Sequence, residues 1–309
     1  MAYLRKRSNG KWSYTVSLGM DPLTQKQKQI TKSGFLTKKE AASAARKVEL
    51  EIENGEFIKE TKTTFESFAL EWIKVYAQNA KVSSVRARNK EMKHFISVWG
   101  HLPIKKISKH IYQKRIVELS EKYSRNYVSG IHACGRMIFK HAVELELIKH
   151  NPTENVQLPK PKVNIEDIEN QENEVKFLEK EELAHFLQLA KSDGLEMDYL
   201  LFTTLAYTGL RIGELLALKW SDFNTEANSI RVTKTLYNPR NNIKEYELLT
   251  PKTVGSIRTI RIDTMLVKML KRHEIKQKEL KLQQGDFYND NKFIFARNDG
   301  HPQLNKDIG

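Results

Sequence analysis

An arginine and a glutamate stand three positions apart in the stretch Leu205–Phe223, LAYTGLRIGELLALKWSDF. Gly209 predicts a turn between a buried helix end and a second helix, which Arg211 begins and on which Glu214 lies one turn later on the same face. Positive charge is poorly placed at a helix N-terminus unless an anion docks there, because the free N–H groups, the helix dipole and the guanidinium then converge on that anion. Arg211 is therefore either a phosphate ligand or an ordinary surface arginine.

The elements around this stretch mix helices with strands. One helix is predicted from Leu178 to about Ala190, and another covers Met197–Tyr207, directly before Gly209. After Asp222 the pattern changes to short apolar and alternating runs, which are typical of strands. The predicted elements there are strands at 229–236, 245–249 and 256–262, a turn at Thr250–Gly255 between the last two, a helix from Thr264, a short strand at Phe293–Phe295 and a turn at Asn298–Gly300.

The charge of the chain points to a polyanionic partner. Its 309 residues include 52 lysines and arginines against 38 acidic residues, a formal charge of +14 with a pI of about 9.5. Nucleic acid is the first candidate for that partner and an anionic membrane surface the second. No apolar run approaches the length of a membrane span and the N-terminus lacks a signal-peptide core, so we expect an intracellular protein. Its one cysteine, Cys134, excludes an internal disulfide and a Cys-based zinc site.

Residues 1–60 are predicted to form a small basic unit. Alternation from Trp12 to Leu18 indicates a half-buried strand, 27–31 a returning strand, and the capping box of Thr37 and Glu40 a helix through about Glu53. Eleven basic residues against two acidic ones between positions 1 and 48 favour duplex DNA, bound by strands in a groove, over a merely solvated basic surface. The expected DNA ligands are Arg5, Lys6, Arg7, Lys11, Lys26, Lys28 and Lys32.

Residues 63–160 are predicted to be entirely helical. Their polar faces are basic, with eighteen lysines and arginines against eight acidic residues between positions 61 and 160. The aromatic side chains follow the helical period, which favours core packing over a base-stacking platform. The predicted helix starts are Thr64 and Ser83 or Ser84 as caps, and Ser108. Gly100 ends the second helix, and the fourth helix runs from Ser124 to Ile148. The apolar stripe of the fourth helix comprises Tyr127, Ile131, Cys134, Ile138, Ala142 and Leu145.

An acidic, proline-containing segment separates this helical part from the rest. Residues 161–174 contain Glu166, Asp167, Glu169 and Glu172 and little apolar content, so we expect an interdomain linker there. The acidity of this segment also indicates that the positive charge is localised elsewhere. Residues 175–309 then form a mixed domain, and the whole chain is predicted to be a multidomain α+β protein.

The sequence TGLRIGELLALKWSDF, followed by strands and by TPKTVGSIRTIRI, resembles the tyrosine recombinase (phage integrase) family. FIFARNDGHP is similar to the stretch that leads toward the second catalytic cluster of that family. The first 60 residues resemble the arm-type DNA-binding domain of integrases from phages and conjugative elements of Gram-positive bacteria. Residues 63–160 resemble the helical, SAM-like core-binding domain, which leaves 175–309 as the catalytic domain.

The resemblance implies a site-specific recombinase that cleaves and rejoins attachment-site DNA through a 3′-phosphotyrosyl intermediate, with neither a metal nor another cofactor. It places Arg211 at the first catalytic arginine, Lys252 at the lysine that protonates the leaving 5′-oxygen, and Glu214 at an acidic residue that supports the arginine. A permanently charged guanidinium suits a phosphoryl transition state, whereas a general acid must release its proton as an ammonium can. The alternative for Lys252 is an ordinary lysine in a turn without a catalytic role. Arg258 and Arg261 are expected to be solvated strand residues.

The second catalytic cluster of the family is His-x-x-Arg, a further His or Trp, and the nucleophilic tyrosine. None of the nine histidines has an arginine three positions later, and Tyr288 lies ahead of the expected cluster in a polar loop. We therefore expect a C-terminally truncated integrase, from a disrupted reading frame or from expression of a shortened chain, that does not cleave DNA alone.

Two functions of different classes remain open at this point. One is a recombinase that is catalytically incomplete, and the other is a non-enzymatic protein that occupies attachment sites or antagonises an intact integrase. The resemblance implies a bacterial cytoplasmic, nucleoid-associated protein, a homo-tetramer on DNA in the intact form, and an accessory DNA-bending or directionality factor. A membrane-surface protein is disfavoured because no amphipathic helix pairs a basic face with exposed aromatics.

Overall fold

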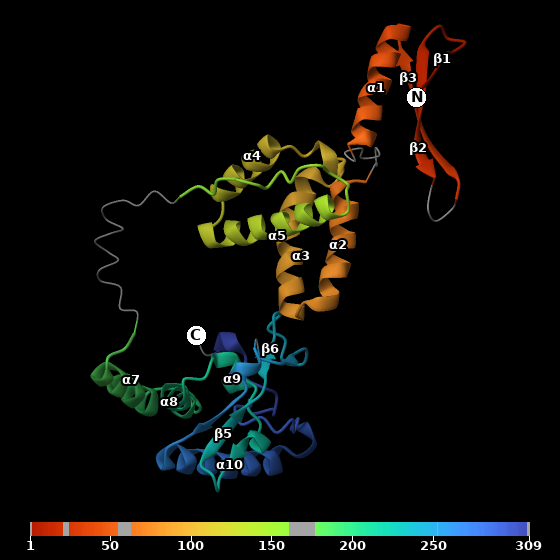
Figure 1. Ribbon diagram of the computed structural model, residues 1–309. Coiled ribbons are helices and arrows are strands. Elements are labelled where there is room, and N and C mark those ends of the chain that lie inside the picture. The colour runs from red at the N-terminus through yellow and green to blue at the C-terminus, as the bar shows by residue number, and fades with distance from the viewer. Residues whose placement is uncertain (1, 21–24, 55–62, 161–176, 252, 308–309) are drawn as a thin grey trace. The chain divides into compact units, whose positions relative to one another are not determined.

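The computed structural model describes residues 2–20, 25–54, 63–160, 177–251 and 253–307 (Figure 1). The chain divides into two compact units, Met1–Val163 and Asn164–Gly309. Small sheets and numerous helices make up these units, which confirms the predicted multidomain α+β class. The predicted linker at 161–174 lies outside the described residues. Within the described part of the chain, no helix is long and apolar enough to cross a membrane.

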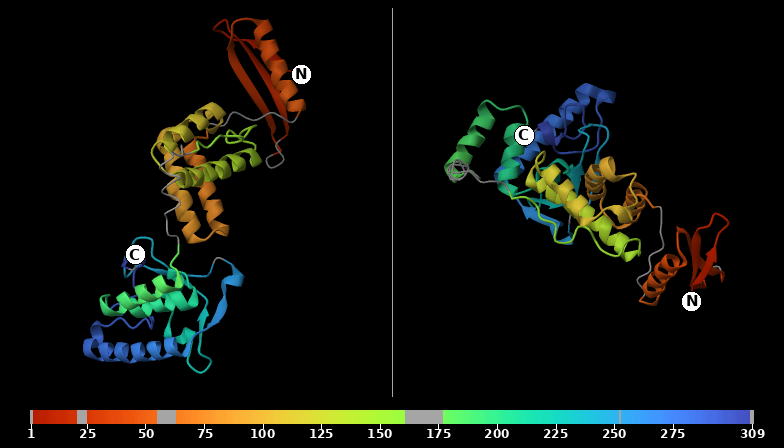
Figure 2. Two further views of the ribbon diagram at one scale, coloured as in Figure 1. Left: turned by 90° about the vertical axis from the view of Figure 1, so that its left-hand side faces the viewer. Right: turned by 90° about the horizontal axis from the view of Figure 1, so that it is seen from above.

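A three-stranded antiparallel sheet begins the first unit, in the order β1-β2-β3. Its strands are β1 (Tyr3–Lys6), β2 (Trp12–Met20) and β3 (Gln27–Phe35), and α1 (Lys38–Glu53) packs against one face of the sheet (Figure 2). The alternation that predicted β2 arises because one of its two sides is buried under α1. β1 escaped the sequence analysis because four residues with two basic side chains show no clear alternation.

The capping box at the start of α1 is confirmed. Thr37 Oγ1 accepts from the N–H of Glu40 at 3.1 Å, and Glu40 Oε2 accepts from the N–H of Thr37 at 3.4 Å. The core under α1 is small and centres on Tyr14, Val16 and Ala45, all almost fully buried. Three strands and one helix can bury only a little apolar area, so this part has a small core.

Four helices form a second core in the first unit: α2 (Phe65–Asn79), α3 (Val82–Trp99), α4 (Lys109–Ser120) and α5 (Arg125–Glu144). Thr64 and Ser108 cap α2 and α4 through their hydroxyl oxygens, as predicted, and Ser124 caps α5 in the same way. The predicted core aromatics pack edge-on and stacked around Phe65, Phe95 and Trp99. Cys134 is fully buried among them, as expected for a small core residue.

Three details of the helical prediction are wrong. α3 begins at Val82 after the cap position Lys81, so neither Ser83 nor Ser84 caps it. α5 ends at Glu144 rather than Ile148 because Glu146 takes a left-handed conformation (φ 55°) and the N–H of Leu147 bonds the carbonyl of Ala142 at 2.9 Å, which closes the helix. Tyr127 and Leu145, which were placed on the apolar stripe, are exposed by 37% and 53%.

The second unit surrounds a core of leucines, isoleucines and phenylalanines. Its described residues begin with α7 (Lys180–Ser192), α8 (Asp198–Thr208) and the short α9 (Ile212–Leu216), and α10 (Thr264–Gln284) follows the strands. Two antiparallel sheets lie between α9 and α10: β4-β5-β8 and β6-β7. Their strands are β4 (Phe223–Asn224), β5 (Ser229–Val232), β6 (Thr235–Tyr237), β7 (Glu247–Leu249) and β8 (Arg258–Arg261).

The strand pairing differs from the prediction. β8 pairs with β5 and β7 pairs with β6, so residues 250–255 do not close a hairpin between the last two strands. The predicted strand 229–236 is interrupted, which lets β5 and β6 join different sheets. Phe293–Phe295 is not a strand, because only an isolated bridge links Phe293 to Lys219. Local sequence could not reveal these differences because the pairing is set by contacts between distant segments.

Candidate functional site

A tight reversal of the chain positions Arg211. Gly209 ends α8 in the left-handed conformation (φ 60°), and its N–H donates to Leu205 O at 2.9 Å. Thr208 Oγ1 donates to Thr204 O at 2.5 Å and accepts from the N–H of Leu210 at 3.4 Å. A residue with a Cβ is strained at this φ, so the glycine allows the turn that delivers Arg211 to the start of α9.

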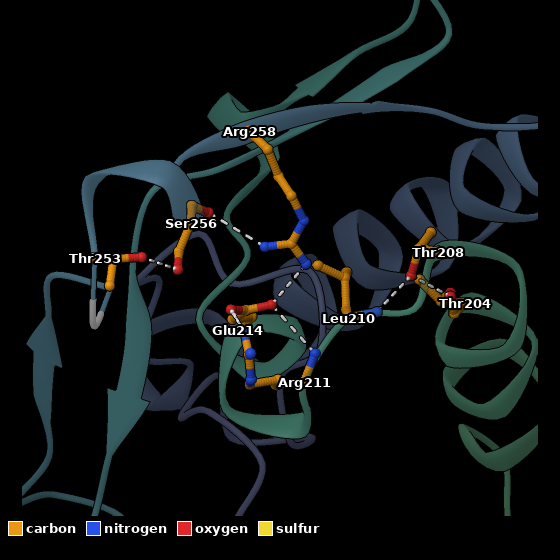
Figure 3. A network of polar contacts seen from close by, with 8 residues as sticks. All are labelled: Thr204, Thr208, Leu210, Arg211, Glu214, Thr253, Ser256 and Arg258. Carbon is orange, nitrogen blue, oxygen red and sulfur yellow. Dashed lines mark hydrogen bonds and ion pairs between the residues drawn. The ribbon is translucent and has the colours of Figure 1, made fainter.

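Glu214 holds Arg211 by two contacts, as shown in Figure 3. Its Oε1 accepts from Arg211 Nη1 at 3.0 Å and its Oε2 accepts from the backbone N–H of Arg211 at 3.2 Å. The Glu214 side chain is only 5% exposed, whereas the Arg211 side chain is 76% exposed. The guanidinium is therefore anchored at one nitrogen, and the remaining donors of Arg211 have no protein partner among the described residues.

Arg258 also binds Glu214, which sequence reasoning missed. Its Nη2 donates to Glu214 Oε2 at 2.9 Å and its Nη1 donates to Ser256 O at 3.2 Å. The side chain is 32% exposed, so the reading of Arg258 as a solvated strand residue is wrong, whereas Arg261 is exposed as expected. The carboxylate of Glu214 could have indicated this contact, since a buried acid needs cationic partners from elsewhere in the chain.

These contacts keep Glu214 ionised. Burial by itself raises the pKa of the carboxyl, but the hydrogen bond from Arg258, together with those from the backbone and side chain of Arg211, outweighs burial and lowers the pKa below its ordinary value. Two guanidinium groups thus share one carboxylate, which leaves a net positive charge at the surface of the site. Such a site attracts an anion.

Close packing of α9 on β6 fixes the backbone of the site. A Cβ on Gly213 would lie 2.6 Å from Thr235 Oγ1 and 3.4 Å from Leu236 O. A larger residue would force the Thr235 hydroxyl to move, so glycine allows the close approach of α9 to β6. The backbone between Arg211 and Glu214 therefore packs closely against the sheet that contains β6.

Lys252 lies outside the described residues. The turn that follows it is closed by a hydrogen bond from Ser256 N to Thr253 O at 3.0 Å and by one between the hydroxyls of Thr253 and Ser256 at 2.9 Å (Figure 3). Arg258 holds the carbonyl of Ser256 in this turn. The role of Lys252 stays a prediction.

Tyr288 shows no sign of activation. Burial, and then the nearby carboxylates of Asp290 and Asp299, raise the pKa of its phenol. A higher pKa makes the hydroxyl harder to deprotonate, which is unfavourable for a nucleophile. Among the described residues, no group of three histidine, cysteine or acidic side chains could hold a metal ion.

The expected DNA ligands of the N-terminal sheet divide between its two faces. Tyr14 and Val16 face α1 and pair with Lys32 and Ile30, so Lys28 and Lys32 alternate on the α1 side, as Lys6 does beside Leu4. Arg5 lies on the opposite, open face. Arg7 and Lys11 belong to the turn between β1 and β2, joined by a hydrogen bond of 2.8 Å, and Lys26 directly precedes β3. The open face consists otherwise of Tyr3, Ser13, Thr15, Ser17, Gln27, Gln29, Thr31 and Ser33.

Three segments of the chain match families of known proteins. Residues 176–308 match the phage integrase family, residues 64–120 the N-terminal SAM-like domain of phage integrases, and residues 3–52 an Arm DNA-binding domain. The chain is 27% identical to a probable integrase of prophage ps2 in Lactococcus lactis subsp. lactis, over 97% of this chain and 78% of that protein. It is 30% identical to the integrase of a Staphylococcus phage, over 81% of this chain and 73% of that protein.

Solved integrases share the fold. The Tn1549 transposon integrase, in complex with transposon right-end DNA, superposes with a TM-score of 0.62 at 20% identity, over 80% of this chain and 75% of that one. A lambda integrase tetramer bound to a Holliday junction gives a TM-score of 0.52 at 16% identity, over 99% of this chain and 80% of that one. The chain therefore belongs to the phage integrase family, a family of tyrosine recombinases.

Proposed function

We propose that this protein acts in site-specific DNA recombination: it binds the duplex DNA of an attachment site and places a backbone phosphate against Arg211. The observation that carries the proposal is the contrast within one ion pair, an exposed guanidinium fixed by a buried carboxylate. A guanidinium offers forked donors and a permanent charge, which match two oxygens of a phosphodiester. Because Arg211 is already oriented, little side-chain entropy is lost when the phosphate arrives.

The three family matches support a division of the DNA-binding work. The sheet at residues 1–60 would insert its open face into a groove, where the amides of Gln27 and Gln29 can contact base edges and Arg5 a phosphate. The helical part at 63–160 would grip the core site through its basic polar faces, and 175–309 would present Arg211, Glu214 and Lys252. On this proposal, Lys28 and Lys32 flank the groove contact because they lie on the α1 side.

Comparing Arg211→Ala with Arg240→Ala tests the phosphate contact. Both arginine side chains are 76% exposed, and each forms an ion pair with one acid, Arg211 with Glu214 at 3.0 Å and Arg240 with Glu245 at 3.3 Å. We expect Arg211→Ala to weaken duplex binding by about tenfold, as for a lost charge-assisted bond, and Arg240→Ala by less than about twofold. Fluorescence anisotropy with a labelled attachment-site duplex measures both. Equal effects would contradict the proposal, because they would reduce Arg211 to general surface charge.

A non-cleaving DNA-binding protein is the second candidate, and one observation favours it. Within the 309 residues, Arg211 and Lys252 are not accompanied by a His-x-x-Arg sequence. These residues would then hold a phosphodiester without cutting it. A nicked suicide substrate carrying the attachment site distinguishes the two candidates, since a covalent protein–DNA band on a denaturing gel means that a nucleophile is present.

Assembly on DNA is the remaining part of the proposal. A lambda integrase has been solved as a tetramer on a Holliday junction, and the present chain shares that fold. We propose that copies of this chain likewise meet on adjacent core sites, aided by an accessory DNA-bending or directionality factor. Analytical ultracentrifugation with one-site and two-site duplexes tests the self-association, which the two-site duplex should promote.

A further inference from the structure

Arg258 touches both segments on which the proposed phosphate site depends. Its Nη2 reaches Glu214 Oε2 at 2.9 Å, and its Nη1 reaches the carbonyl oxygen of Ser256 at 3.2 Å (Figure 3). The first contact lies on α9, which Arg211 precedes, and the second lies in the turn that follows Lys252. One guanidinium therefore joins segments that are 44 positions apart in the sequence.

Glu214 is the group through which Arg258 meets Arg211. Its Oε2 accepts from Arg258 and from the backbone N–H of Arg211, while its Oε1 accepts from Arg211 Nη1. A carboxylate is planar, so a bond that fixes Oε2 also fixes the direction in which Oε1 accepts. The orientation of the Arg211 guanidinium thus depends on a bond that Arg258 makes.

Exposure separates the roles of the two arginines. Arg258 is 32% exposed with both Nη atoms bonded to protein, whereas Arg211 is 76% exposed with one Nη atom bonded. We propose that Arg258 is a positioning residue, which orients Arg211 through Glu214 and braces the turn beside Lys252. The expected effect on DNA rests on the proposed function, but the orientation of Arg211 can be measured without DNA.

The first experiment measures Arg211 directly. The Nε–Hε resonance of Arg211 is recorded by NMR in the 309-residue protein, assigned by its loss in Arg211→Lys, and compared in Arg258→Gln and Arg258→Lys. Lysine keeps the charge but lacks the fork that bonds two acceptors at once, so we expect both variants to shift the resonance and to speed its exchange with water. Arg261→Gln, which removes an exposed arginine from the same strand, is the control and should leave the resonance in place.

Thermal unfolding of each variant shows whether it is folded. If Arg258→Gln is not folded, the comparison is made with Arg258→Lys alone. An unchanged Arg211 resonance in the folded Arg258 variants would overturn the proposal. A shift that Arg261→Gln reproduces would overturn it as well, because the effect would then come from charge alone.

The second experiment is a double-mutant cycle on duplex binding. Arg211→Ala and Arg258→Gln should each weaken affinity by about fivefold or more, and the double variant should be no more than about twofold weaker than Arg211→Ala. Independent, multiplying effects would mean that Arg258 does not act through Arg211. If Arg211→Ala leaves affinity unchanged while the NMR shift is present, the proposed phosphate contact fails and the positioning role of Arg258 stands.

Discussion

Glu214 serves two cations with one buried carboxylate, and this makes the site sensitive to a single charge. A buried acid is tolerated only when charged partners compensate for its lost hydration. Here Arg211, three residues away, and Arg258, on the distant strand β8, provide that compensation, and both also reach solvent. The same contacts that stabilise the fold therefore orient the group that is proposed to bind phosphate.

Replacing Glu214 by Gln should destabilise the protein by about 2 kcal/mol, because the amide leaves two guanidinium groups facing each other without a counter-charge. Urea denaturation followed by circular dichroism measures the change. Glu245→Gln is the matched control, since the Arg240–Glu245 pair is exposed on both sides and should contribute less than about 1 kcal/mol. A Glu214→Gln variant as stable as Glu245→Gln would show that the shared carboxylate contributes little.

The stability that Glu214 confers should depend on pH. Its folded pKa lies below the reference value of 4.5, so its contribution is present above that value and is lost as the pH falls through the folded pKa. The difference in unfolding free energy between wild type and Glu214→Gln should therefore be full at about pH 6 and narrow by about pH 3. Urea titrations at the two pH values test this. A constant difference would mean that the pKa of Glu214 is not lowered by folding.

The C-terminal end of α5 is set by backbone hydrogen bonds and not by a residue type that favours a helix end. Two residues after the end of α5, Glu146 takes the left-handed conformation, which glycine adopts without strain. The helix stops before it because two backbone bonds, from Glu146 to Val143 and from Leu147 to Ala142, satisfy its last carbonyls. The sequence has no glycine at this position that would predict the end of the helix.

Glu146→Gly should accordingly stabilise the helical part by about 0.5–1 kcal/mol, since it relieves the strain of φ 55°. Glu144→Gly, two positions earlier at the last residue of α5, should instead lower the stability by up to about 1 kcal/mol. Differential scanning calorimetry on the two variants gives the signs. A loss of stability in Glu146→Gly would show that its side chain contributes more than its backbone strain costs.

The chain carries a charge of +14, and its described residues form three separate core clusters. Separate cores allow each part to keep its fold while it contacts a different stretch of DNA. Affinity then depends on the total number of phosphates neutralised, because each neutralised phosphate releases counterions.

Duplex binding should therefore fall steeply with salt. If the parts together contact six or more phosphates, the association constant should drop by about 10³ or more between 50 and 200 mM salt. Arg5→Gln, on the open face of the N-terminal sheet, should reduce the log–log slope by about one, whereas Lys32→Gln on the α1 face should change it less. Anisotropy titrations at several salt concentrations give the slopes. Equal slopes for both variants would argue against the open face as the groove contact.

The sequence alone determined the family, the helices with strong periodicity or side-chain caps, and the placement of Arg211 and Glu214 together at the start of a helix. These follow from local rules: amphipathic period, capping chemistry and a turn that requires glycine. The functional role of Arg211 and Glu214 stays a prediction. The expected positions of Lys252 and the DNA ligands remain predictions.

Only the tertiary structure decided how the strands pair, where α5 ends and what Arg258 does. Each depends on contacts between segments far apart in the chain, such as the 44 positions between Glu214 and Arg258. On its own strand, Arg258 is indistinguishable from the exposed Arg261, because both are basic residues among isoleucines and threonine. A buried carboxylate on another element makes the difference, and folding alone brings it within hydrogen-bonding distance.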